Sequence, residues 1–154
     1  MAAKQSRRIK AVATMLKREN HDLQNERVNL AQRLQELKMH ESAVASASEE
    51  LGYVEARARE LLQAGSFLSV ESLTGLLQYM PAVRRKLDDA ETERKRSELA
   101  AVDAGETVVQ LKARARGIER VHDRLAAQQS LDIERDLARE LDDLWLQRQD
   151  STHD

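Results

Sequence analysis

The sequence predicts an all-α fold: a long antiparallel two-helix coiled-coil hairpin with a short apolar helical tip, formed by residues 1–154 as one unit. Three observations predict it. An apolar residue returns at every seventh position in the first third of the chain, the composition is typical of long helices, and the two ends carry opposite charge. Because a seven-residue repeat keeps its members on one stripe of a helix, that stripe must pack against a partner helix.

The repeat predicts a first helix from about residue 4 to about residue 64. Its main stripe consists of Ile9, Leu16, Leu23, Leu30, Leu37, Val44 and Leu51, and Ala58 continues it. The companion positions beside this stripe are mixed. They are apolar at Val12, Ala13, Leu34, Ala47, Val54, Leu61 and Leu62, but polar at Asn20, Arg27, Glu41 and Ser48. The seam, which is the line along which two helices meet, is therefore weak in the middle and depends on a partner.

The tip is expected over residues of about 65–81. Gly65-Ser66 follows the periodic run, and a glycine in that position usually ends a helix. Ser69 can cap a short helix, and Pro81 is expected to break that helix or to begin the next one. The most apolar stretch of the chain lies between these signals and contains Phe67, Leu68, Val70, Leu73, Leu76, Leu77, Tyr79 and Met80.

A second helix is expected over residues of about 82–147. Its main stripe consists of Val83, Ala90, Ala104, Leu111, Ile118 and Leu125, in phase with Ser97. Its neighbouring stripe consists of Leu87, Ala101, Val108 and Ala115. The apolar phase shifts near residues 128–130 and resumes with Ile133, Leu137, Leu141 and Leu144. Such a shift changes the supercoil locally, and residues 149–154 are expected to fray.

The composition favours long helices over a compact globular domain. Charged residues make up 34% of the 154 residues and aromatic residues 3%, whereas a compact core usually has more aromatic side chains. No segment approaches the roughly 20 apolar residues that span a bilayer, and no apolar signal segment follows Met1. The absence of cysteine excludes disulfides and fits a reducing compartment. We therefore expect a soluble, cytoplasmic protein.

The charge distribution favours antiparallel pairing. Residues 1–18 contain no acid and six basic residues, which are Lys4, Arg7, Arg8, Lys10, Lys17 and Arg18. Residues 132–154 contain eight acidic and three basic residues. If the chain doubles back, these opposite charges lie side by side, although each exposed pair contributes at most a few tenths of a kcal/mol.

No constellation of residues predicts catalysis, so we expect a non-enzyme without cofactor, metal or small-molecule substrate. Glu119 and His122 have the spacing of half a di-iron site, but the second Glu-x-x-His pair that such a site needs is missing. His21-Asp22 and His122-Asp123 are adjacent in sequence, so their side chains point to different sides of a helix.

Basic groups provide an alternative interpretation, since a basic stripe can bind nucleic acid. They lie at residues 7–10, 84–86, 94–96 and 114–124. Aromatic side chains for base stacking are missing, and acidic residues interrupt the groups at Asp88, Asp89, Glu91, Glu93, Glu98 and Glu119. We therefore expect solvated helix faces and no nucleic acid. The acid-free start of the chain also fits adsorption to an anionic membrane, but the heptad begins inside it at Ile9.

The order of these features resembles that of a known family. A tip containing Leu-Leu-Gln-Tyr follows the basic first helix, and residues 133–148 close the return helix with Ile-Glu-Arg-Asp-Leu-Ala-Arg-Glu-Leu-Asp-Asp-Leu-Trp-Leu-Gln-Arg. This ending is similar to that of the flagellar FliJ family and of its virulence-system relatives of the YscO type. The matching positions are Arg139, Asp142, Asp143, Leu144 and Arg148. Trp145, where the family usually has a small residue, and Pro81, within its continuous helix, depart from the pattern.

The resemblance implies a non-enzymatic stalk component of a bacterial type III protein export apparatus, flagellar rather than injectisome. Its open end would enter the hexameric export ATPase ring and promote the assembly and activity of that ring. The candidate ATPase-binding residues are Arg7, Ile9, Lys10, Leu16, Arg139, Asp142, Asp143, Leu144 and Arg148. The resemblance also implies contact with the export gate membrane protein, escort of export chaperones and peripheral association with the inner membrane. The candidate gate-binding residues are Tyr53, Leu76, Tyr79, Met80, Val83 and Leu87.

The same residues have a structural alternative. The seam residues among them pack within the hairpin on this interpretation, and they are Ile9, Leu16, Val83, Leu87 and Leu144. Leu76, Tyr79 and Met80 are expected to form an exposed apolar patch, because a hairpin tip has little core in which to bury them. The alternatives at the level of function are an injectisome stalk protein of the same type and a generic coiled-coil scaffold. Parallel pairing in a scaffold is disfavoured because it would bring the basic N-termini together.

Overall fold

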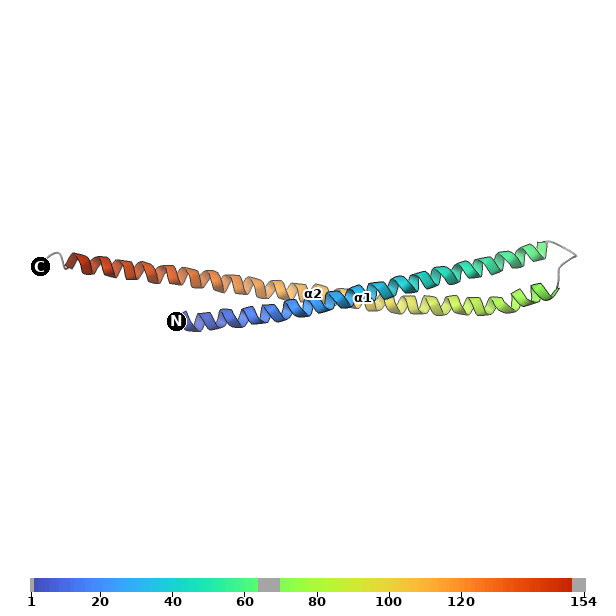
Figure 1. Cartoon of the computed structure of the whole chain (residues 1–154), viewed down its shortest axis with the longest axis horizontal. Helices are drawn as coiled ribbons and strands as arrows, with labels where there is room; N and C mark the ends of the chain where they lie inside the picture. The colour runs from blue at the N-terminus through green and yellow to red at the C-terminus, as the bar shows by residue number, and fades with distance from the viewer. Residues whose placement is uncertain (1, 64–69, 151–154) are drawn as a thin grey trace. The chain divides into compact units, whose positions relative to one another are not determined.

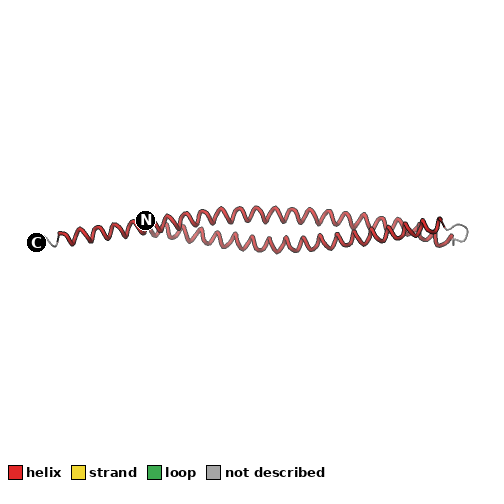
Figure 2. The backbone as a smooth tube through the Cα atoms, turned by 90° about the horizontal axis from the view of Figure 1, so that it is seen from above, coloured by secondary structure: helices red, strands yellow, loops and turns green. Residues whose placement is uncertain are grey.

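The computed structural model describes the backbone of residues 2–63 and 70–150, and the side chains of residues 5–63, 70–146 and 148. Helix α1 spans Ala2–Gln63 and helix α2 spans Val70–Asp150. The two helices run antiparallel and pack against each other, which confirms the all-α two-helix hairpin (Figure 1). Every described residue is helical (Figure 2). Within the described residues, neither helix has a segment long and apolar enough to cross a membrane.

The expected helix break at Pro81, with a separate tip helix before it, is wrong. Helix α2 begins at Val70 and continues through Pro81. Proline removes the amide that would pair with the carbonyl of Leu77, one turn earlier. Both side chains are exposed, so this carbonyl lies on a solvated side of the helix, where water can replace the missing donor. The expected stop and cap at Gly65, Ser66 and Ser69, and the apolar residues Phe67 and Leu68, lie outside the described residues.

The chain divides into two compact units, each of which contains a length of both helices. The first unit combines residues 1–25 with residues 109–154, and the second comprises residues 26–108. In the second unit, the helices meet through small side chains. Its buried residues are Ala47, Val54, Ala58, Val83, Ser97, Ala101 and Ala104. The four alanines among them allow the two backbones to approach closely, so the core between the helices contains few large side chains.

The first unit has a smaller core than the second. Leu23 and Ala115 are its buried residues among those described. Ile9 and Leu16 on α1, and Ile118 and Leu125 on α2, are half-buried. In both units the main stripes expected from the heptads therefore face the partner helix.

The companion stripe of α1 lies three residues after the main stripe, and this corrects part of the expectation. Val12, Ala47, Val54 and Leu61 face α2 as expected, whereas Leu34 and Leu62 are exposed. The polar residues expected in the seam are exposed as well, namely Asn20, Arg27, Glu41 and Ser48. Glu19, Glu26 and His40 take their place as the half-buried polar positions. Polar side chains therefore do interrupt the seam, but at these positions rather than at the expected ones.

The apolar phase shift near residues 128–130 does not redirect the seam. Gln129 and Asp132 continue the old phase and are half-buried, because the helix keeps its regular turn. The apolar residues of the new phase consequently lie outside the seam and are exposed, and these are Ile133, Leu137, Leu141 and Leu144. Fraying was expected from Gln149, but α2 extends to Asp150. Residues 151–154 lie outside the described residues.

Candidate functional site

An exposed apolar row lies near the C-terminal end of α2, in the first unit. We call Ile133, Leu137, Leu141 and Leu144 the terminal stripe. Their spacing of four, four and three residues places them on one face of the helix. Figure 1 shows that this end of α2 extends past the N-terminal end of α1. All four side chains are at least half exposed, and Leu141 is 67% exposed. The terminal stripe therefore lacks cover within the described part of the chain.

Two shallow grooves adjoin the terminal stripe. One, of about 260 Å³, is lined by Leu141, Leu144, Trp145 and Arg148. Trp145 thus widens the apolar surface at the position where the resemblance predicts a small residue. The other groove, of about 310 Å³, lies where the start of α1 meets α2. Its lining residues are Gln5, Gln129, Asp132, Ile133, Arg135, Asp136 and Arg139.

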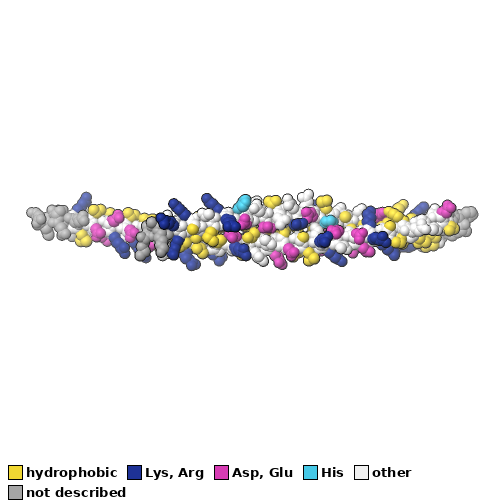
Figure 3. Space-filling view, turned by 90° about the horizontal axis from the view of Figure 1, so that it is seen from below, with side chains coloured by type: hydrophobic (Ala, Val, Ile, Leu, Met, Phe, Trp, Pro, Cys, Tyr) yellow, Lys and Arg dark blue, Asp and Glu magenta, His cyan; other side chains and the backbone are white. Residues whose placement is uncertain are grey.

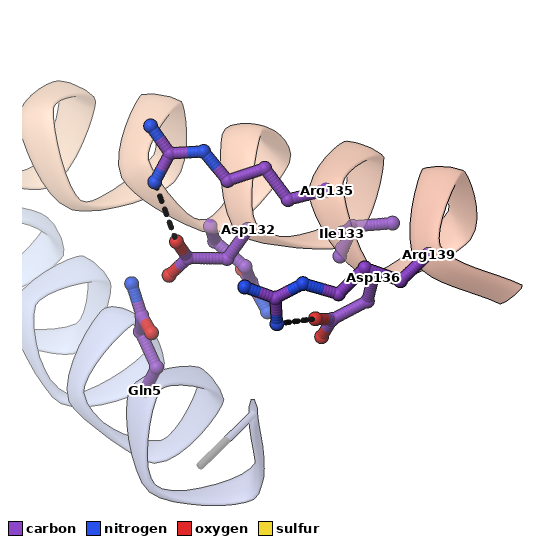
Figure 4. A pocket seen from close by; sticks show the side chains of 7 residues that line it. Gln5, Asp132, Ile133, Arg135, Asp136 and Arg139 are labelled. Carbon is purple, nitrogen blue, oxygen red and sulfur yellow. Dashed lines mark ion pairs between the residues drawn. The ribbon is translucent and has the colours of Figure 1, made fainter. Parts of the chain in front are cut away.

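Acidic side chains border the terminal stripe. Figure 4 shows Gln5 of α1 pointing toward Asp132 of α2, which pairs with Arg135 at 4.0 Å. Asp136 pairs with Arg139 at 3.6 Å. The remaining acids form no ion pair within the described part of the chain, and they are Glu134, Glu140, Asp142 and Asp143. This end of α2 therefore displays negative charge that no described side chain neutralises.

The rest of the first unit has the opposite charge. Ten basic residues form no ion pair with any described residue: Arg7, Arg8, Lys10, Lys17, Arg18, Lys112, Arg114, Arg116, Arg120 and Arg124. Between them lies an apolar groove of about 240 Å³, lined by Val12, Met15, Gly117, Ile118 and Val121. We call it the basic-flanked groove. Figure 3 shows a face on which hydrophobic side chains gather beside Lys and Arg.

The candidate ATPase-binding residues all lie in the first unit and differ in accessibility. Arg7 and Lys10 are exposed, as are all five candidates on α2, Arg139, Asp142, Asp143, Leu144 and Arg148. Ile9 and Leu16 are half-buried against α2, as the structural alternative predicts. Leu144 does not follow that alternative, because it lies beyond the phase shift.

The candidate gate-binding residues lie in the second unit and are mostly part of its seam. Val83 is 2% exposed, and Leu76, Met80 and Leu87 are half-buried. The expected exposed patch therefore includes Tyr79 but not the full side chains of Leu76 and Met80. Sequence reasoning missed the exposed apolar residues nearby, which are Leu62, Val70 and Leu77. Counting the heptad back from Val83 and Leu87 would have assigned Leu76 and Met80 to the seam.

A polar cluster of Glu50, Tyr79 and Lys86 joins the two helices. The Nζ of Lys86 donates to Glu50 Oε2 at 2.6 Å, and the Tyr79 hydroxyl donates to Glu50 Oε1. Hydrogen bonds from Lys86 and then from Tyr79 lower the pKa of Glu50. The same carboxylate raises the pKa values of Tyr79 and Lys86 by accepting their hydrogen bonds. This cluster fixes the relative position of the two helices locally.

No metal-binding group emerges from the described side chains. They contain no cluster of three or more His, Cys, Asp or Glu residues that could hold an ion. His122 is half-buried in the seam, with Nδ1 at 3.4 Å from Asp123 Oδ1, while Glu119 is exposed. The candidate functional features are therefore the terminal stripe with its acidic border, the basic-flanked groove and the exposed residues near the start of α2. Comparison of the chain with protein-family models, with curated proteins and with solved structures finds no match.

Proposed function

We propose that this protein is a non-enzymatic stalk component of a bacterial flagellar type III protein export apparatus. It binds the hexameric export ATPase and promotes assembly and activity of the ring. It also contacts the export gate and escorts export chaperones, at the cytoplasmic side of the inner membrane.

The observation that carries the proposal is the uncovered terminal stripe. The residues that resemble the ending of the FliJ family coincide with this stripe and its acidic border. Leu144 is exposed there together with Asp142 and Asp143. An apolar row with charged borders is the kind of surface that binds a protein partner, and nearby Arg7 and Lys10 add exposed positive charge.

The hairpin supports a mechanism of coupling without chemistry. One end of an antiparallel helix pair can enter a ring while other surfaces remain free to touch the gate. Tyr53 and Tyr79 are the exposed gate candidates, and the cluster around Glu50 holds Tyr79 in place. Binding energy at the ring, rather than any catalytic group of this chain, would then favour ring assembly.

The test is the ATP hydrolysis rate of the export ATPase from the same organism, measured with increasing amounts of this chain. The wild-type chain is expected to raise the rate, and Leu141→Ser/Leu144→Ser is expected to abolish most of the increase. Leu99→Ser is a matched control, because Leu99 is also an exposed α2 leucine but lies in the second unit. A wild-type chain that leaves the rate and the ring assembly unchanged would refute the proposal.

A further inference from the structure

We propose that the basic-flanked groove binds the terminal stripe of a second copy of this chain, so that copies associate head to tail through their first units. This inference does not rest on the proposed function, and the two partners compete, because a stripe bound to a second copy is not free to bind the ATPase. It rests on two uncovered apolar surfaces whose borders carry opposite charge. Both surfaces lie within residues 1–25 and 109–154.

Gly117 lines the groove without a side chain to fill it. A Cβ added there would meet no atom within 4 Å, so a larger side chain would fit without displacing the protein's own atoms and would occupy the groove. Met15 on the opposite wall is 57% exposed, and Val121 is also exposed. The groove thus offers apolar walls and room for an apolar side chain from outside.

Four arginines bracket this groove. On α1, Arg8 precedes Met15 by seven residues and Arg18 follows it by three, so they share its face. On α2, Arg114 and Arg124 stand in the same relation to Val121. All four are exposed and form no ion pair with a described residue. The occupant of the groove should therefore be apolar in the middle and acidic at its border.

The terminal stripe meets both requirements. Asp136, Glu140 and Asp143 each precede a leucine of the stripe by one residue, so a row of acids runs beside a row of leucines. The lengths also agree. The first and last residues of the stripe are eleven residues apart, about 16 Å, and the arginines on each helix are ten residues apart, about 15 Å, at the rise of an α-helix.

The occupant must come from another copy. The stripe and the groove lie on the same continuous helix α2, about 20 residues or 30 Å apart, so one chain cannot bring them together without breaking that helix. Leu137 follows Val121 by sixteen residues, so the stripe and the α2 wall of the groove lie about 160° apart around the helix, on nearly opposite faces. One neighbouring copy therefore occupies the groove while another contacts the stripe, and the copies associate head to tail rather than as a closed two-fold pair.

Charge exchange provides the decisive experiment, with association measured by sedimentation velocity on the full chain. Variant A replaces the groove arginines with acids (Arg114→Glu/Arg124→Glu), and variant B replaces the stripe acids with bases (Glu140→Arg/Asp143→Arg). The wild-type chain is expected to associate, with a dissociation constant that rises with salt. Each variant alone is expected to bind itself at least about tenfold more weakly, because like charges then meet. A mixture of A and B restores complementary charge at both kinds of contact and is expected to form mixed assemblies.

Filling the groove tests its shape independently of charge. Gly117→Gln should weaken association about tenfold and retain the helix, since Gln is the better helix former. Gly52→Gln is the control, because Gly52 is also exposed with open space around its Cβ but lies in the second unit.

The proposal is overturned if the wild-type chain stays monomeric, if the mixture of A and B does not associate, or if Gly117→Gln leaves association unchanged. Vesicles with anionic lipid and a DNA duplex test the rival occupants. If the wild-type chain binds either one and variant A does not, while the chain does not self-associate, the groove belongs to that anionic ligand and the proposal fails.

Discussion

Ser97 stands at a heptad position where the helices of the second unit meet, and it is 8% exposed. Its hydroxyl oxygen has no hydrogen-bond partner among the described residues, and the same holds for Oε2 of Glu19 in the first unit. A buried polar atom without a partner loses its hydration and gains nothing in return. These two residues therefore oppose the packing that the neighbouring alanines and leucines favour.

Replacing Ser97 with alanine should stabilise the protein. Ser97→Ala removes the uncompensated hydroxyl and introduces the best helix former, so the free energy of unfolding should rise by about 1 kcal/mol. Urea denaturation followed by circular dichroism measures this. Ser130→Ala serves as the control, because Ser130 is exposed and its replacement gains helix propensity alone. Equal effects of the two substitutions would contradict the argument.

The ionisation of Tyr79 should depend on Glu50. The ordinary tyrosine pKa is 10.0, and the hydrogen bond to Glu50 raises the pKa of Tyr79. The bond stabilises the protonated phenol, so its contribution is complete below pH 10.0 and disappears as the pH rises through the folded-state pKa. In a Tyr53→Phe background, phenolate absorbance reports Tyr79. Glu50→Gln should lower that pKa toward 10.0, and an unchanged titration curve would count against the cluster.

At the scale of the elements, the main stripes of both helices could be predicted from sequence, because seven-residue spacing determines which side chains share a face. The companion stripe of α1 was less certain, since both the third and the fourth position after each stripe residue lie beside it. Leu34 is apolar but exposed, and Glu19 is polar but half-buried. Which of these positions faces inward depends on how the two helices cross, and a single helical pattern does not contain that information.

Pro81 shows a second limit of sequence reasoning. Proline predicts a break because it removes one amide and crowds the preceding turn. Whether the helix stops depends on whether the freed carbonyl finds another hydrogen-bond donor. Here the freed carbonyl is that of Leu77, on the exposed side of α2, where water can donate. The helix tolerates the loss of this backbone hydrogen bond because α1 packs against the other side of α2 and leaves the carbonyl open to water.

Substituting Pro81 should therefore strengthen α2. Pro81→Ala restores the amide and should raise the free energy of unfolding by up to about 3 kcal/mol. Hydrogen exchange at residues 78–84, together with denaturation, measures the effect locally and globally. Pro81→Gly restores the amide with a poorer helix former, so its gain should be about 1 kcal/mol smaller. A loss of stability in Pro81→Ala would show that the proline is needed where it stands.

At the scale of the whole molecule, the opposite charges of the two ends predicted antiparallel pairing, and the hairpin has that direction. The charges themselves do not pair as expected: the described basic residues of 1–18 form no ion pair with α2, whose acidic end extends past the start of α1 (Figure 1). The candidate interaction residues were harder to assign, since a heptad position looks the same whether its partner is internal or foreign. Ile9 and Val83 pack within the helix pair, whereas Leu144 does not. The difference arises because Leu144 follows the phase shift and lies beyond the start of α1, which only the folded chain reveals.

Antiparallel pairing within one chain can be tested because the sequence contains no cysteine. Gln5 and Gln129 line one groove of the first unit, and Glu36 and Arg96 line another groove in the second unit. Introducing cysteines at either pair should allow a short bis-maleimide to join them within a single chain, at concentrations low enough to prevent association. A cysteine at position 5 combined with one at position 96 is the control, since these positions lie in different units.

The product of the reaction distinguishes the two arrangements. An intrachain link leaves the mass of one chain and creates a loop that proteolysis cannot separate, whereas parallel pairing of two chains joins like positions and doubles the mass. Both native pairs should give the single-chain product, because each belongs to a groove formed by both helices. If the 36–96 pair gives mainly double-mass product on dilution, the helices of the second unit come from different chains, and the hairpin is contradicted there. Testing the 5–129 pair separately then decides whether the first unit behaves in the same way.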